Sequence, residues 1–140
     1  MIAVPIRAGM AAHLHLAAAG RAAVADDVSA VQRYDRCRRA LRVGAMSMPA
    51  DALKAPSVAA WVRRRGVTVH TASAGGLAIA LNAGIAPARI TVHCNDEAAY
   101  TRYGVQVGVG RLVIRSQDQL DTITDCPQST PRVLIDLSVC

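Results

Sequence analysis

The sequence contains no phenylalanine, and aromatic residues make up only 3% of its 140 positions. Lys54 is the only lysine, so nearly all of the positive charge comes from arginine, and the formal net charge is +6. Proteins that bind nucleic acid usually interleave basic residues with aromatic ones or carry a known binding module. The scarcity of aromatic residues therefore argues against a nucleic-acid-binding protein. The arginine clusters are interpreted as solvated helix faces.

No apolar run approaches the ~20 residues of a membrane-spanning helix, so a membrane protein is not expected. Cysteines are few and far apart, without the spacing of zinc ligands, so no metal site is predicted. Free thiols in a reducing cytoplasm are the default expectation for such cysteines. They are Cys37, Cys94, Cys126 and Cys140.

Residues 1–25 are small and apolar, but Arg7, His13 and His15 interrupt them. An export signal would have an uninterrupted apolar segment, so none is predicted. We interpret residues 1–25 as an N-terminal extension that is poorly ordered, and residues 26–140 as one domain.

From residue 26 onward the sequence alternates helical patterns with β-branched runs. Four of the five predicted helices begin at or after a capping residue or a proline: Asp26 and Asp27, Pro56, Asp96 and Ser116. The predicted helices are Val28–Leu41, Pro56–Arg65, Leu77–Asn82, a segment with Ala99, Tyr100 and Tyr103, and a segment through Leu120 and Ile123. The predicted strands are Val43–Ser47, Val67–Thr71, Ile90–His93, Arg111–Arg115 and Val133–Val139.

The strands begin about 24, 23, 21 and 21 residues apart. Regular spacing of this kind, with a helix between successive strands, predicts parallel strands joined by right-handed crossovers. Two folds fit, an open doubly wound sheet and part of a (β/α)8 barrel. A complete barrel needs ~200 residues or more, so this length would hold about half of one.

Several motifs occur in order between the second and fourth predicted strands. They are Ser73-Ala74-Gly75-Gly76-Leu77, Ala83-Gly84-Ile85-Ala86-Pro87-Ala88-Arg89-Ile90, His93-Cys94-Asn95, Gly108-Val109-Gly110 and Val113-Ile114-Arg115-Ser116. This order resembles the N-terminal barrel of the pyridoxal-phosphate decarboxylases with the alanine-racemase-like fold, and is most similar to the diaminopimelate decarboxylases. The resemblance covers roughly residues 43–139. It implies an α/β fold, a partial TIM-like barrel of about five parallel strands with outer helices.

The resemblance also implies a pyridoxal phosphate cofactor held by a lysine at the end of the first strand. A gapless comparison places Asp51 at that position, whereas a three-residue shortening would place Lys54 there. Lys54 is thus the only candidate for the Schiff-base lysine, and both placements stay open. Other family positions are changed too, because Gly76 and His70 stand where the family has acidic residues.

Ligands of parallel α/β sheets bind at the carboxyl ends of the strands. We therefore expect Ser73, His93 and Asn95 to lie near a cofactor. Cys94 and His93 are poor partners for nucleophilic catalysis, because adjacent strand residues point to opposite faces. The Ser73–Gly76 segment is predicted to be a tight turn of small residues. Gly75 and Gly76 could bind an anion weakly through free N–H groups.

Three functions follow from these patterns. The first is a truncated, degenerate decarboxylase relative without decarboxylase activity of its own, a pseudoenzyme. The second is a subunit of an amino-acid decarboxylase that a partner chain completes. The third is a non-enzymatic interaction module. Because an incomplete barrel has two open strand edges, self-association or a partner chain is expected.

Overall fold

The computed structural model describes residues 27–40, 46–127 and 131–137. Five strands form one parallel sheet in the order β1-β2-β3-β4-β5, so the spatial order follows the sequence. The strands are β1 (Ser47–Pro49), β2 (Thr68–Thr71), β3 (Ile90–His93), β4 (Arg111–Ile114) and β5 (Arg132–Ile135). A doubly wound sheet reverses its strand order at a switch point, whereas a barrel keeps the sequential order. The predicted arc of a (β/α)8 barrel is therefore confirmed.

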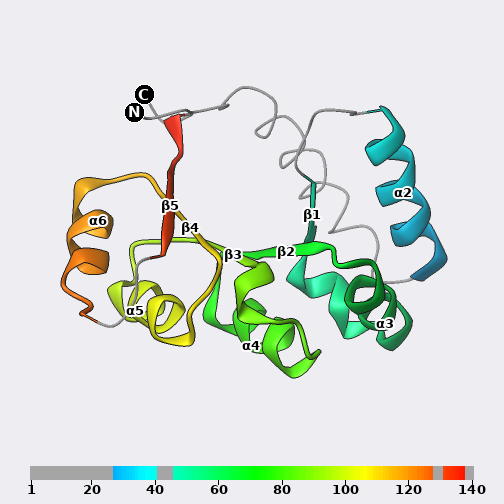
Figure 1. Ribbon diagram of the computed structural model, residues 1–140, viewed down its shortest axis with the longest axis horizontal. Helices are drawn as coiled ribbons and strands as arrows, with labels where there is room; N and C mark the ends of the chain where they lie inside the picture. The colour runs from blue at the N-terminus through cyan, green and yellow to red at the C-terminus, as the bar shows by residue number, and fades with distance from the viewer. Residues whose placement is uncertain (1–26, 41–45, 128–130, 138–140) are drawn as a thin grey trace.

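Helices connect the strands and cover one side of the sheet. Figure 1 shows the sheet as a curved layer with α3, α4, α5 and α6 along its convex side. The helical elements are α2 (Asp27–Ala40), η1 (Ala50–Lys54), α3 (Pro56–Arg65), α4 (Ala74–Asn82), η2 (Pro87–Arg89), α5 (Ala98–Val107) and α6 (Gln117–Thr124). Within the described residues, no helix combines the length and the apolarity needed to cross a bilayer.

The core lies between the sheet and this helical layer. Val69 of β2 pairs with Ile90 of β3, Val92 of β3 pairs with Leu112 of β4, and all four side chains are fully buried. The Cβ that an alanine would carry at Gly104 of α5 would lie 3.4 Å from Leu112 and 3.6 Å from Val92, so these side chains face the helices. Because side chains alternate along a strand, the residues between them face the concave side.

Two helix ends are predicted correctly by the residues that cap them. Pro56 opens α3, and Gly66 ends it in the left-handed region at φ 67°, as predicted. The Ser116 side chain accepts a hydrogen bond from the Gln119 N–H and so caps α6, also as predicted. The helix α2 places Tyr34 against Trp61 of α3. The two ring centroids lie 5.2 Å apart in an edge-to-face arrangement.

Several predicted boundaries are wrong. The small-residue turn at Ser73–Gly76 is instead the start of α4, which begins at Ala74 rather than Leu77. Glu97, not Asp96, precedes α5 at the cap position. The helix α5 runs from Ala98 to Val107, and the absence of a side chain at Gly104 lets it approach the sheet closely.

The first and last strands differ from their predicted ranges. β1 consists of Ser47–Pro49, later than the predicted Val43–Ser47, and residues 43–45 lie outside the described residues. β5 ends at Ile135, before the predicted Val139. The predicted N-terminal extension, residues 1–25, also lies outside the described part of the chain.

Candidate functional site

Polar side chains gather on the concave face of β1, β2 and β3: Ser47 begins β1, His70 lies inside β2 and His93 ends β3. A 2.7 Å hydrogen bond joins Ser47 Oγ to His70 Nδ1. The ring centroids of His70 and His93 lie 5.9 Å apart, with the rings edge to face. The sheet register explains this cluster, because His70 pairs with Thr91, two residues before His93. These three side chains could hold a polar or anionic ligand on the concave face.

Asn95 connects the turns that follow neighbouring strands. Its Oδ1 accepts a 2.9 Å hydrogen bond from the Glu97 N–H, and its Nδ2 donates to the Ala72 carbonyl at 3.3 Å. Gln119 of α6 donates from Nε2 to the Asn95 carbonyl at 3.2 Å and accepts from the Arg115 N–H at 2.8 Å. Asn95 lies at the carboxyl-end edge, as predicted, with its side chain bound to the backbone.

Ser73 has its hydroxyl engaged in the helix that follows it. Its Oγ accepts a 3.1 Å hydrogen bond from the Gly76 N–H, which makes Ser73 the N-cap of α4. The Gly76 N–H is thus occupied, and it is one of the groups that the predicted weak anion site would need. Ser73 itself is exposed at the carboxyl end of β2.

Cys94 is fully buried and lies beyond the end of β3, on the opposite side of the strand from His93. Burial raises the pKa of the Cys94 thiol above its ordinary value of 9.0. A thiol must ionise to act as a nucleophile, so Cys94 is unsuited to that role at neutral pH. Its environment instead fits a small apolar core side chain.

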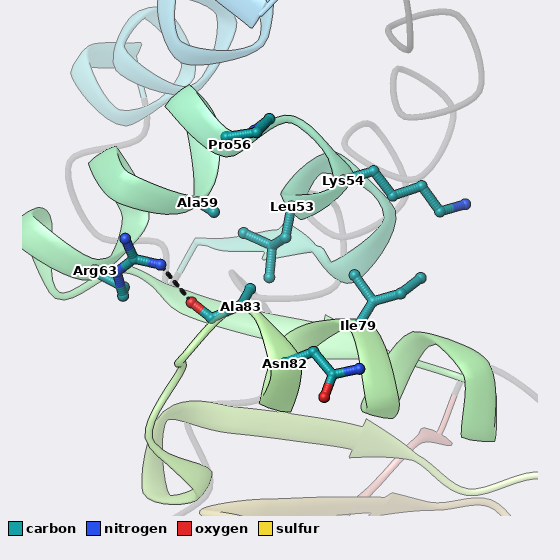
Figure 2. A pocket seen from close by; sticks show the side chains of 8 residues that line it. All are labelled: Leu53, Lys54, Pro56, Ala59, Arg63, Ile79, Asn82 and Ala83. Atoms are coloured by element: carbon teal, nitrogen blue, oxygen red, sulfur yellow. Dashed lines mark hydrogen bonds between the residues drawn. The ribbon is translucent and has the colours of Figure 1, made fainter.

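Lys54 is the last residue of η1, which directly follows β1. The family resemblance places the cofactor-binding lysine at the end of this first strand. The Lys54 Nζ lies 2.9 Å from Asp51 Oδ1, and the Lys54 side chain is 59% exposed. Lys54 lines a pocket of about 410 Å³. Figure 2 shows its amine extending away from Arg63 and Ala83. The pocket is lined by Leu53, Lys54, Pro56, Ala59, Arg63, Ile79, Asn82 and Ala83.

The lining residues of this pocket belong to η1, α3, α4 and the positions beside them, and no strand contributes. The pocket therefore lies in the helical layer, separate from the concave cluster of Ser47, His70 and His93. Arg63 lines it too, and its Nη1 donates to the Ala83 carbonyl at 2.6 Å. The structure thus separates Lys54 from His93, although the sequence predicted both beside one cofactor.

An aldehyde cofactor held as an imine needs a lysine amine that is uncharged and shielded from water. Lys54 instead is mostly exposed and paired with a carboxylate. The alternative position, Asp51, cannot form an imine. Lys54 and Asp51, the two residues at the candidate position, therefore do not fit a covalently held pyridoxal phosphate.

Sequence reasoning missed two members of the carboxyl-end network. The sequence marks His70 only as a replacement for an acidic family residue, although it lies in the β-branched strand that precedes the strand with His93. Gln119 carried no signal, because one glutamine in a helical pattern is ordinary. Its role depends on α6 lying beside the turn after β3, which only the fold shows.

Comparisons with known proteins identify the family. Residues 28–139 match the model of the pyridoxal-dependent decarboxylase pyridoxal-binding domain. Diaminopimelate decarboxylases of Mycobacterium tuberculosis strain H37Rv and Mycobacterium bovis are each 33% identical over 94 residues, covering 64% of this chain and 21% of theirs. The Mycobacterium leprae protein of the same name is also 33% identical, with 20% of its length covered.

This chain therefore spans about a fifth of the length of the curated relatives it matches. The family match includes α2, which precedes the region where the motifs occur, and it extends through β5. The sequential parallel sheet, the helices on its convex side and the match over residues 28–139 agree, and the chain belongs to the pyridoxal-dependent decarboxylase family through its pyridoxal-binding domain.

Proposed function

We propose that this chain is a diaminopimelate-decarboxylase-like domain that keeps the family fold but does not decarboxylate amino acids on its own. The observation that carries the proposal is the position of Lys54, the only lysine in the sequence. It lies on η1 at the rim of a pocket in the helical layer, paired with Asp51. This position separates its amine from the concave cluster of Ser47, His70 and His93.

The chemistry of residue 51 supports the same conclusion. Asp51 follows β1 by two residues, where a gapless comparison places the family lysine. A carboxylate cannot condense with an aldehyde, and Asp51 Oδ1 lies 2.9 Å from Lys54 Nζ in an ion pair. The only lysine amine of the sequence is therefore engaged with a carboxylate.

Titration with pyridoxal phosphate tests the proposal. We expect no saturable imine absorbance and, after borohydride reduction and peptide mass spectrometry, no stoichiometric adduct at Lys54. The matched variant is Asp51→Lys combined with Lys54→Asp, which preserves the ion pair and moves the amine to position 51. If only that variant forms a saturable imine, the result supports the view that Asp51 stands in the place of the family lysine.

Decarboxylation is measured separately, as carbon dioxide release from meso-diaminopimelate with the cofactor present. The name of the curated relatives suggests this substrate. We expect no release above the free-cofactor background for either protein form. A saturable adduct at Lys54 together with release of carbon dioxide that Lys54→Arg abolishes would overturn the proposal.

A further inference from the structure

The pocket between the outer helices α3 and α4 lies apart from the concave cluster. Helices α5 and α6 pack against each other, whereas α3 and α4 both pack against η1, which holds them apart. The space left between them is about 410 Å³, and sites for small molecules measure roughly 300–1,000 Å³. All of the lining residues lie between residues 53 and 83, so three successive helical elements and the positions beside them build this pocket.

Apolar side chains form much of the lining. Leu53 and Ala59 are buried, with 4% and 5% of their surfaces exposed, and Ile79 is partly buried. Figure 2 shows Leu53 with Arg63 on one side and Ile79 on the other. Contact with an apolar ligand removes the surfaces of both ligand and lining from water, which favours binding. This part of the pocket therefore suits the hydrocarbon part of a ligand.

Arg63 adds a cation whose orientation is fixed. Its Nη1 donates to the Ala83 carbonyl at 2.6 Å, the bond drawn in Figure 2. A guanidinium has five N–H donors in a planar fork, and within the described residues no carboxylate lies within ion-pair distance of Arg63. Lys54, by contrast, is paired with Asp51, and its amine points away from Arg63. Arg63 is therefore the side chain of this pocket that suits an anion.

We propose that this pocket binds a small amphipathic carboxylate, with the carboxylate on Arg63 and the hydrocarbon part against Leu53 and Ile79. A guanidinium binds both oxygens of a carboxylate through parallel N–H···O bonds. The surrounding charge acts in the same direction, because Arg64 and Arg65 follow Arg63 in the last turn of α3. An uncharged apolar molecule would gain nothing from the guanidinium, and a small hydrophilic anion would leave the apolar lining in water.

Isothermal titration calorimetry of the full chain with octanoate tests the ligand class. The cofactor is left out, so the result does not depend on whether Lys54 forms an imine. We expect saturable binding of one octanoate per chain. Hexanoate and butanoate should bind progressively more weakly, by up to about 4-fold for each methylene group removed. Octylamine, which has the same hydrocarbon chain and the opposite charge, should show no saturable binding.

Two matched pairs of variants locate the site. Arg63→Gln removes the guanidinium and should raise the dissociation constant of octanoate by ~10-fold or more. Arg64→Gln removes the same charge from the next residue, which is exposed and does not line the pocket, and should change the constant by less than ~3-fold. Ile79→Ala should raise the constant by ~3-fold or more. Leu81→Ala makes a similar truncation on α4 outside the lining and should leave it unchanged.

NMR chemical-shift mapping reports the position of the bound octanoate. The side-chain amide resonances of Asn82, which lines the pocket, should shift on titration. Those of Gln106, which is exposed on α5, should stay in place.

Three results would overturn the proposal. They are the absence of saturable octanoate binding at any concentration below micelle formation, equal affinities for octanoate and octylamine, and equal losses of affinity in Arg63→Gln and Arg64→Gln. Circular dichroism shows whether each variant is folded. The ligand series uses the wild-type chain, so its outcome decides the question even if a variant does not fold.

Discussion

Arg89 is a residue of the family motif whose role in this structure is structural. Its Nη2 donates to the carbonyls of Val62 and Val67, each at 2.8 Å, and its Nη1 lies 3.5 Å from the Arg63 carbonyl. The last carbonyls of a helix lack partners within the helix and carry partial negative charge. Arg89 thus fixes the end of α3 and the entry to β2 from the turn before β3.

Replacing Arg89 by methionine should lower the free energy of unfolding by roughly 1.5–3 kcal/mol, the usual range for hydrogen bonds to a charged group. Arg64→Met removes the same charge from an exposed helix position and should change stability by less than about 0.5 kcal/mol. Urea unfolding followed by circular dichroism measures both. Equal effects of the two variants would show that net charge, rather than the carbonyl contacts, is what matters.

At the scale of an element, α4 shows how packing overrides local propensity. Glycine disfavours helices, so Gly75 and Gly76 indicated a turn. In the structure Ser73 caps the helix, and Gly76 is buried against Thr71, so that a Cβ at Gly76 would collide with Thr71 Oγ1. Gly75 has no neighbouring atom within 4 Å of the position of such a Cβ.

The two glycines of α4 should therefore respond oppositely to alanine. Gly75→Ala should raise the free energy of unfolding by about 0.4–1 kcal/mol, because it restricts the unfolded chain without a clash. Gly76→Ala should lower it by roughly 1–3 kcal/mol, because Thr71 must move. Thermal and urea unfolding of both variants measure the difference. A stabilising Gly76→Ala would mean that the Thr71 side chain rotates away freely.

Local signals predicted most of the elements. Proline at position 56, glycine at 66 and serine at 116 determine helix ends through short-range contacts, so those boundaries are confirmed. The place of Gly104 inside α5 depends instead on the distance between that helix and the sheet. A sequence pattern contains no information on that distance.

At the scale of the whole molecule, strand spacing and motif order predicted the arc of a barrel. The side-chain network at the carboxyl ends was less accessible. The Ser47–His70 hydrogen bond joins residues 23 positions apart, and the Gln119–Asn95 bond joins residues 24 positions apart. Such pairs depend on the register between strands and on helix placement, which no short motif encodes.

The core also predicts how the stability of the whole domain depends on pH. Burial raises the pKa of Tyr100 from 10.0 to about 12 and raises the pKa of Cys94 above 9.0. In alkaline solution the unfolded chain therefore loses these protons first and binds fewer protons than the folded chain. Stability should be fully present at pH 8 and should fall as the pH rises from about 9 toward 12.

Urea unfolding at several pH values between 8 and 11 measures this dependence. Tyr100→Phe should make the decline above pH 10 shallower, and the variant should fold, because phenylalanine keeps the buried ring and removes only the hydroxyl group. Tyr103→Phe is the matched control, because Tyr103 is 41% exposed. The same decline in the wild type and in Tyr100→Phe would contradict the assignment.

The contact between Thr71 and Gly76 also makes the consequences of substitutions at these two positions depend on each other. Thr71 Oγ1 occupies the space that any side chain at position 76 would need, and it bonds to both backbone groups of Ser73. Any side chain added at position 76 is therefore expected to destabilise the fold while Thr71 is present. A smaller residue at position 71 should relieve this clash, so substitutions at positions 71 and 76 should have coupled effects on stability.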